Sequence, residues 1–264
     1  MTDPFYKAHW REIDAERMSG YREGFGWDAA AEELYAPADI RAGHLVADFG
    51  CGPGKVALAL AGQVGPEGHV HALDINEAFL DMVVRGAREA GLSDRVTAHP
   101  SDGAALPLAD GALDRVSARN TLMYVDDAVA TLQEFRRVLR PGGLAHAIDG
   151  DWHMMVAEPV DRAEWRDFVD AAAHACRHAD MGRRLHGAFV AAGFADVRVQ
   201  VVARADTEGR LLGMVRNMAR YATDGGRMAG SRAASIVDGL DRALAEGTYL
   251  AVSPQFVVTG IRPG

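Results

Sequence analysis

The sequence predicts an α/β fold with a doubly wound, mostly parallel sheet. From residue 44 to residue 149, short apolar runs alternate with amphipathic stretches of helix length, a pattern typical of βαβ units. A glycine-rich turn follows the first apolar run, and acidic residues close the second and follow the third. Because the carboxyl ends of parallel strands meet at one edge of a sheet, we expect these polar residues to form a ligand crevice there.

The first part of the chain supplies five expected strands and three expected helices. The strands are expected at 44–49, 69–74, 95–100, 114–119 and 144–149, and the helices at 55–63, 77–90 and 127–139. The run Arg140-Pro141-Gly142-Gly143 is a stop-and-turn signal. We therefore expect the fifth strand to begin at Leu144.

The remaining elements divide the chain into four parts. Helices are expected at about 5–18, 27–35, 162–178, 182–192, 207–222 and 231–245, and strands at 195–203 and 249–261. We assign residues 1–40 to an N-terminal helical lid, 41–205 to the core, 206–246 to a helical cap insertion and 247–264 to the final strand of the core sheet.

Composition excludes several classes of function. The 264 residues carry a formal net charge of −9, which argues against a nucleic-acid partner. Cys51 and Cys176 are too few for a disulfide framework, so we expect a reduced, cytoplasmic protein. The first residues show no signal peptide, and no apolar run approaches the ~18 residues of a membrane span. We expect a small-molecule partner and leave self-association open.

The glycine-rich turn is the most informative segment. Residues 46–54, VADFGCGPG, follow a strand and open a helix, where glycines let a ligand approach the main chain and the helix N-terminus favours a carboxylate. A dinucleotide fingerprint counted from Gly52 ends at Ala57 in its alanine variant, but it leaves Asp48 and Gly50 unexplained. A Walker A loop is excluded because Phe49 stands where its first glycine is needed.

Two further acids end the next strands. Asp74 closes the second strand, where its two oxygens can accept from both hydroxyls of a ribose; the alternative is a helix N-cap, for which Asn76 is also available. Asp102 follows the third strand and can accept from an adenine amine; the alternative is an ordinary Asp-Gly turn. Asn120 and Thr121 follow the fourth strand and are expected to face the same crevice.

These segments together resemble the class I S-adenosylmethionine-dependent methyltransferases, in the branch with small-molecule and quinone methyltransferases. The matching segments are VADFGCGPG at 46–54, ALDIN at 72–76, SDGAALPL at 101–108 and RVLRPGG at 137–143, and the resemblance covers about residues 40–205 and the last strand. It implies a Rossmann-like, seven-stranded sheet with an antiparallel last strand. S-adenosylmethionine is the implied cofactor, and S-adenosylhomocysteine the product.

The resemblance also assigns the cofactor-binding residues. Asp48 and the glycine loop would contact the methionine part, Asp74 the ribose, and the residues after the second and third strands the adenine. The full expected set is Asp48, Gly50, Cys51, Gly52, Gly54, Asp74, Ile75, Phe79, Ser101, Asp102, Gly103 and Asn120.

Candidate catalytic and substrate residues are weaker assignments. His153, His186 and Tyr21 are candidates for a base or other catalytic group, although a lone histidine is more often structural. The lid and substrate candidates are Tyr6, Trp10, Tyr21, Tyr124 and Trp152. The acidic run Asp149-x-Asp151-x-His153 lacks clear partner acids, so we expect no metal.

The sequence therefore predicts methyl transfer to an N, O or C atom of a small metabolite, for instance in natural-product biosynthesis. Two alternatives stay open: a cofactor-binding protein that acts as a cyclase or binding module without methyl transfer, and a protein or RNA methyltransferase. The segment Arg119-Asn120-Thr121-Leu122 lacks the Pro-Pro-aromatic element of amino-methylating DNA enzymes.

Overall fold

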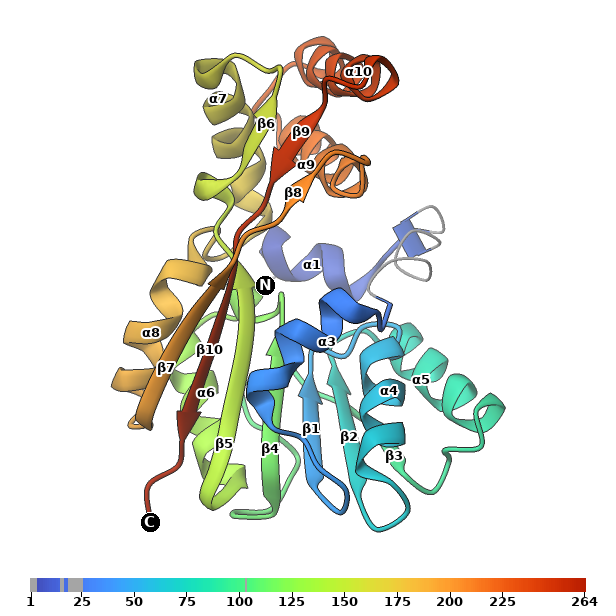
Figure 1. The fold of residues 1–264 in the computed structure, drawn as a ribbon, viewed down its shortest axis with the longest axis vertical. Coiled ribbons are helices and arrows are strands. Elements are labelled where there is room, and N and C mark those ends of the chain that lie inside the picture. The colour runs from blue at the N-terminus through green and yellow to red at the C-terminus, as the bar shows by residue number, and fades with distance from the viewer. Residues whose placement is uncertain (1–3, 15–16, 19–25, 103) are drawn as a thin grey trace.

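The computed structural model describes residues 4–14, 17–18, 26–102 and 104–264, and its main element is a seven-stranded sheet (Figure 1). The strand order is β3-β2-β1-β4-β5-β10-β7. Strands β1 to β5 are parallel, and β10 is antiparallel to both β5 and β7, as expected. The strands are β1 (Leu45–Phe49), β2 (His69–Asp74), β3 (Val96–Pro100), β4 (Leu113–Arg119), β5 (Leu139–Gly150), β7 (Ala195–Val202) and β10 (Gln255–Ile261).

Helices cover both faces of this sheet. One face carries α3 (Ala29–Tyr35), α4 (Lys55–Val64) and α5 (Glu77–Glu89), and the other α6 (Ala128–Val138) and α8 (Met181–Ala191). Side chains of β1 alternate between the two faces: Val46 packs with α4, whereas Ala47 and Phe49 pack with the α6 side. Burial on both faces explains why the central strands read as continuous apolar runs.

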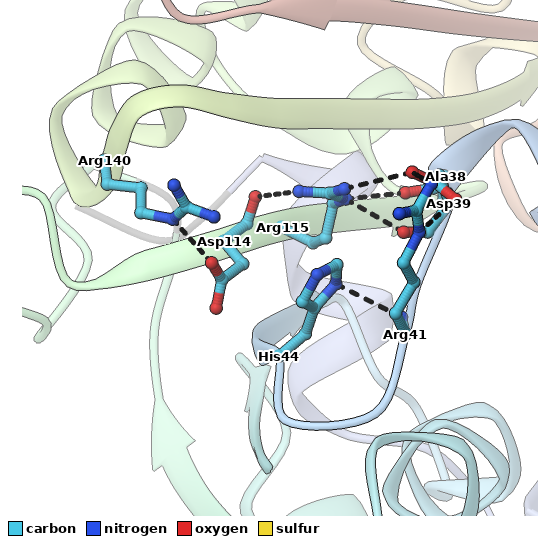
Figure 2. Close-up of polar contacts among 7 residues, drawn as sticks. All are labelled: Ala38, Asp39, Arg41, His44, Asp114, Arg115 and Arg140. Atoms are coloured by element: carbon cyan, nitrogen blue, oxygen red, sulfur yellow. Dashed lines mark hydrogen bonds and ion pairs between the residues drawn. The ribbon is translucent and has the colours of Figure 1, made fainter.

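A polar cluster fastens the amino ends of the central strands (Figure 2). Arg115 Nε donates to the Ala38 carbonyl at 2.9 Å, and its guanidinium lies 3.3 Å from an Asp39 oxygen. Asp114 accepts from the Leu45 backbone N–H at 2.8 Å and pairs with Arg140 at 2.5 Å. These contacts fix the segment after α3 to the start of β4, at the sheet edge opposite the expected crevice.

A cap lies beyond the carboxyl ends of the parallel strands and is built from two separate stretches of chain (Figure 1). Strands β6 (Val156–Glu158), β9 (Leu250–Val252) and β8 (Ala205–Asp206) form an antiparallel sheet in that order. Helix α10 (Gly230–Glu246) contacts β6, α9 (Leu212–Asp224) packs on α10, and α7 (Arg162–Ala172) packs on α9. The sequence placed the cap at 206–246 alone, so β6, α7 and β9 are additions from the structure.

Several expected boundaries were wrong, among them the end of α7 (Ala172, expected at 178) and the start of α9 (Leu212, expected at 207). Strand β5 begins at Leu139 rather than Leu144, because Gly142 and Gly143 exchange backbone hydrogen bonds with Arg262 and stay in the sheet through a register shift. The expected strand 249–261 is split into β9 and β10 around Pro254, which has no N–H to donate. Helix α1 (Phe5–Arg11) ends before residue 18, with Glu12 extended. No helix in the described part of the chain is long and apolar enough to cross a membrane.

Candidate active site

The loop after β1 forms the floor of the candidate site. The backbone N–H groups of Gly50 and Cys51 both donate to the Leu73 carbonyl, at 2.7 and 3.0 Å, which ties the loop to β2. A Cβ on Gly50, whose φ is +73°, would lie 2.1 Å from Thr121 Oγ1, so the β4 loop leaves room only for glycine. Gly52 has φ +52° and open space where its Cβ would be. A ligand can therefore approach the main chain at Gly52.

Asp48 is a buried acid with an unused oxygen. Its side chain lies near the carboxyl end of β1 and is 2% exposed. Within the described residues, Asp48 Oδ2 has no hydrogen-bond partner. Burial raises the pKa of Asp48 to about 7, and the nearby Asp74 charge adds to this while Arg119 opposes it. A buried carboxyl in this state gains from a cationic or hydrogen-bond-donating ligand.

Asp74 faces the same loop from the end of β2. Its Oδ2 accepts from the Gly52 N–H at 2.8 Å, and its Oδ1 accepts from the Asn76 N–H at 2.9 Å. Burial raises its pKa, and these backbone hydrogen bonds counteract the rise. Asn76 caps α5 by accepting from Ala78 and Phe79, so the N-cap alternative for Asp74 is wrong. Each Asp74 oxygen keeps a further lone pair for a ligand hydroxyl.

The loop after β3 lies beside Asp74. The Ser101 N–H donates to the Asp74 carbonyl at 2.9 Å. Asp102 is exposed, and its Oδ1 accepts from the Ala104 N–H at 3.1 Å, which is the turn geometry considered as its alternative role. Gly103 lies outside the described residues.

The remaining expected cofactor residues border the same loops. Phe79 is 2% exposed at the start of α5, and Ile75 is half-buried directly after β2. Asn120 directly follows β4 in the left-handed region, with φ +51°, and its N–H donates to the Ile148 carbonyl at 2.7 Å. This bond holds the backbone bend that brings Thr121 against Gly50.

Helix α1 clamps two of these loops at once. Tyr6 Oη and Lys7 Nζ each lie 2.6 Å from a carboxylate oxygen of Asp126, beyond the end of β4. The Trp10 carbonyl accepts from Asn76 Nδ2 at 2.7 Å, beyond the end of β2. Tyr21, the third lid candidate, lies outside the described residues. The structure thus places Tyr6 and Trp10 over the loops that border the candidate site.

The other side of α1 contacts the cap (Figure 1). Phe5 stacks on His174 with ring centroids 4.9 Å apart. Arg17, which follows α1 in the chain, donates to Tyr221 Oη at 3.3 Å. Tyr124, a substrate candidate, lies edge-on to Trp10 at 5.0 Å. An aromatic layer therefore joins α1, the turn after β4 and the cap.

The structure separates the two candidate histidines from this layer. His186 is exposed on α8, whose opposite face packs on the sheet. His153 Nε2 lies 3.3 Å from Asp170 Oδ1 on the cap helix α7, and its side chain is 39% exposed. Trp152 is buried and donates its backbone N–H to the Ala179 carbonyl. Neither histidine is therefore held in the roof formed by α1.

The acids of the Asp149-x-Asp151-x-His153 run have separate partners. Asp149 Oδ2 accepts from the Leu122 N–H at 3.2 Å, and burial raises the pKa of Asp149. Asp151 is fully buried and pairs with Arg183 through two hydrogen bonds, one of 2.8 Å. Over the described parts of the chain, no group of three His, Cys, Asp or Glu side chains is arranged to hold a metal ion.

Sequence reasoning missed His9, which occupies the centre of the aromatic layer. His9 is 7% exposed and packs against Phe5, Trp10, Tyr124 and Tyr221. The available signal was its i, i+4 spacing from Phe5, which places both rings on one face of a helix. That spacing does not reveal which loops or cap helices the face would meet.

The strand order, the glycine loop and the flanking acids define an α/β domain of the class I methyltransferase type. Comparison agrees: residues 46–143 match the protein family described as a methyltransferase domain. This match assigns residues 46–143, rather than the whole chain, to a methyltransferase domain.

Two curated relatives show the same relationship. Methyltransferase GfsG of Streptomyces halstedii is 34% identical over 145 residues, which cover 54% of this chain and 49% of the relative. A demethylmenaquinone methyltransferase of Lactobacillus johnsonii is 30% identical over 143 residues, which cover 54% and 56%. The chain spans about half the length of these relatives.

Solved structures share the fold across most of the chain. Phosphoethanolamine N-methyltransferase 2 of Haemonchus contortus, solved with S-adenosyl-L-methionine, aligns with TM-score 0.68 and 14% identity, covering all of this chain and 61% of that one. The 4+2 cyclase SpnF aligns with TM-score 0.57 and 21% identity, covering 91% and 84%. At these identities the likeness concerns the fold.

Proposed function

We propose that this protein transfers a methyl group from S-adenosylmethionine to a small-molecule acceptor. The observation that carries the proposal is the pair of buried acids, Asp48 before the glycine loop and Asp74 bonded to it, together with the open main chain at Gly52. When bound, the cofactor supplies a methyl group on a sulfonium sulfur and leaves as S-adenosylhomocysteine. The family match at residues 46–143 supports this choice over a nicotinamide dinucleotide.

The residues present fit the cofactor part by part. Asp48 offers a free oxygen to the cationic ammonium of the methionine part, and Gly52 leaves space beside it. Asp74 offers lone pairs to the two ribose hydroxyls. Phe79 and Ile75 would line the adenine pocket, and Ser101, Asp102, Gly103 and Asn120 would complete its rim.

The roof of the site supports a small, desolvated acceptor. Helix α1 and the aromatic layer cover the loops, so a bound acceptor is held against the cofactor with little water. Alignment of this kind supplies as much as ~7–11 kcal/mol of the barrier in favourable systems. Tyr6, Trp10, Tyr124 and Trp152 are the proposed lid and substrate residues. A hydroxyl, amine or carbon of a natural-product precursor or quinol is the acceptor we propose.

We further infer a cytoplasmic setting. Both cysteines, Cys51 and Cys176, are free and buried, which suits a reducing compartment. The net charge of −9 supports a metabolite rather than a nucleic acid as the partner. Whether copies of the chain associate is a question for light scattering of the purified protein.

Calorimetric titration of S-adenosylmethionine tests the cofactor assignment. Asp74→Ala removes hydrogen bonds from a charged acceptor, so we expect affinity to fall roughly 10- to 100-fold. Asp81→Ala, on the exposed side of α5, is the matched control and should bind like the wild type. Equal affinity of Asp74→Ala and wild type would refute the ribose assignment.

Label transfer tests the reaction itself. The wild-type chain is incubated with methyl-labelled S-adenosylmethionine and a panel of phenols, quinols, amines, protein fractions and RNA. We expect label in a small molecule. Label in protein or RNA would favour the macromolecular alternative, and tight cofactor binding without any transfer would favour a cyclase or binding module, as the resemblance to SpnF allows.

A further inference from the structure

The imidazole of His9 occupies the roof of the candidate site, between α1, the turn after β4 and the cap. Its ring lies 5.0 Å from the Phe5 ring, 5.9 Å from Tyr124 and 5.2 Å from Tyr221, measured between centroids. These three partners come from α1, the 3-10 helix Leu122–Tyr124 and α9. His9 is thus enclosed where the lid meets both the core and the cap.

One hydrogen bond fixes the tautomer of His9. Its Nδ1 bonds to the Phe5 carbonyl, one helical turn earlier. A carbonyl oxygen can only accept, so Nδ1 carries the proton. In the neutral ring, Nε2 then holds a lone pair. Across the residues that the structure describes, Nε2 is buried and makes no hydrogen bond.

The surroundings of His9 keep its ring neutral. Burial lowers its pKa to about 4, the Phe5 carbonyl counteracts this, and the charges of Arg17 and His174 lower it further. Among the described residues, the ionisable groups that face the ring are Arg17, His174, Tyr124 and Tyr221, and none of them is a carboxyl. At neutral pH the lone pair on Nε2 is therefore present, and no described residue donates to it.

The contacts of α1 hold the helix that carries His9 against the proposed cofactor loops. Trp10, the next residue, is bound through its carbonyl to Asn76, whose own N–H donates to Asp74. Tyr124 donates its backbone N–H to Thr121, which fills the space beside Gly50. The roof around His9 thus rests on the loops after β2 and β4, and through Thr121 on the loop after β1.

We propose, on the basis of the methyl transfer proposed above, that His9 Nε2 accepts the proton of the methyl acceptor. The acceptor is then a protic group, an O–H or N–H of a small molecule that enters when α1 lifts. Its heteroatom bonds to the methyl carbon as the methyl–sulfur bond breaks, with the electron pair of that bond staying on sulfur. The acceptor's proton passes to Nε2, which becomes an imidazolium and releases the proton to water.

His174 provides a matched comparison in the same layer. It also stacks on Phe5, and its Nδ1 is bonded to the Ala171 carbonyl at 3.0 Å. However, a Cβ on Gly225 would lie 2.4 Å from His174 Nε2, so the α9 end packs directly on that atom. His174→Gln disturbs the packing of this layer but leaves His9 Nε2 in place, so it should lower the methylation rate less than His9→Gln does.

Nuclear magnetic resonance of the histidine-labelled full chain, with S-adenosylhomocysteine bound, tests the premise without any turnover. We expect the His9 signal to show a protonated Nδ1 and an unprotonated Nε2 from pH 8 down to pH 5. His9→Gln identifies the signal by its loss. A protonated Nε2, or an ordinary pKa near ~6.5, would overturn the inference.

Kinetics of His9→Gln test the role. With the acceptor identified by label transfer, we expect kcat to fall on the order of 10²-fold or more with KM within a few-fold. The remaining rate should rise about tenfold per pH unit, because it depends on acceptor that has already ionised. Added imidazole should restore part of the activity of His9→Ala.

The outcomes separate the two proposals. If the wild type binds the cofactor and methylates the acceptor while His9→Gln does so at the same rate and with the same pH profile, the role of His9 is wrong and the methyl transfer stands. If the wild type neither binds S-adenosylmethionine nor transfers label, the proposed function itself fails. Equal losses in His9→Gln and His174→Gln would show a packing role and also overturn the inference.

Discussion

At the scale of single residues, Asp48 couples ligand binding to protonation. Its pKa is raised to about 7 by burial, and one of its oxygens has no partner in the described structure. A cationic ligand at that oxygen favours the carboxylate and lowers the pKa. We therefore expect S-adenosylmethionine binding to release up to about half a proton at pH 7, and closer to one at about pH 6.

Calorimetry in buffers of different ionisation enthalpy measures that proton. For the wild type, the apparent binding enthalpy should change with the buffer; for Asp48→Asn it should not. A binding enthalpy independent of the buffer in the wild type would show that Asp48 is not protonated in the free protein near neutral pH.

The same residue should lower stability at alkaline pH. Because the pKa of Asp48 rises from 3.8 to about 7 on folding, the folded state holds an extra proton between these values. The free energy of unfolding is then highest, as far as Asp48 is concerned, below about pH 4, and it falls as pH rises towards 7. At pH 8, the free energy of unfolding of Asp48→Asn, measured by urea titration, should exceed that of the wild type by on the order of 1–4 kcal/mol. The difference should vanish at pH 4, and a difference independent of pH would contradict the assignment.

Residue identities alone predicted that the glycine loop and two acids would lie together at one sheet edge; their cofactor roles stay predictions. The positions of the glycine loop, Asp48 and Asp74 relative to the predicted strands are enough to locate them, since a turn after a strand must lie at the sheet edge. The sequence did not reveal His9, because its neighbours Tyr124 and Tyr221 are distant in the chain. Its role depends on contacts that form only when lid, core and cap meet.

At the scale of elements, Asn76 links the stability of α5 to the position of α1. Its Oδ1 caps α5, and its Nδ2 donates to the Trp10 carbonyl. Asn76→Ala should cost about 1 kcal/mol through the lost cap and also release α1. Hydrogen exchange of residues 5–11 should accelerate.

Asp161→Ala serves as the control for that experiment. Asp161 caps α7 in the same way, through Ala163 and Glu164, but does not contact α1 in the bonds described. It should show a similar loss of stability with unchanged exchange in α1. Faster exchange in both variants would mean that α1 responds to global stability rather than to Asn76.

The elements themselves were largely predictable where periodicity is strong. Helices α4, α5, α6 and α8 lie within one or two residues of their expected positions, because each shows one apolar face. The start of β5 was not predictable, since Gly142 and Gly143 stay in the sheet only through Arg262. Turn chemistry read locally gave the wrong answer there.

At the scale of the whole molecule, an ion pair with a buried carboxylate stabilises the segment through which the chain passes from the core to the cap. Asp151 follows β5 where the chain leaves the core, is fully buried and pairs with Arg183. Arg183→Ala leaves that carboxylate without its cation. Loss of a partner in a fully buried pair costs ~3–5 kcal/mol, and the half-exposed Arg183 should give less, about 1–3 kcal/mol.

Arg184→Ala is the neighbouring control for Arg183→Ala. Arg184 lies 3.5 Å from Asp180 and donates to His178 Nδ1 at 2.7 Å, and these contacts are on the exposed surface. Its removal should change the free energy of unfolding, measured by urea titration, by less than about 0.5 kcal/mol. Equal effects of the two variants would show that the Asp151–Arg183 pair stabilises the fold no more than an exposed surface pair does.

The architecture of the whole was predicted from the resemblance, but the composition of the cap was not. Strand β6 pairs with β9, and β9 with β8, so the small sheet joins segments from both sides of α8 and β7. No local pattern in β6 or β8 marks this pairing, because each is only two or three residues long. Long-range pairing of such short strands can be seen only in three dimensions.

Strand β7 touches the main sheet through β10 alone, and β10 is made after the whole second cap segment. During synthesis, β1 to β5 can associate early, yet the outer edge of β5 stays open until residues 255–261 leave the ribosome. In a nascent chain stopped after β7, the two strand edges that β10 later pairs, one of β5 and one of β7, are therefore open. Chaperone binding to such stalled chains, and its loss once β10 emerges, is the expected signature of this strand order.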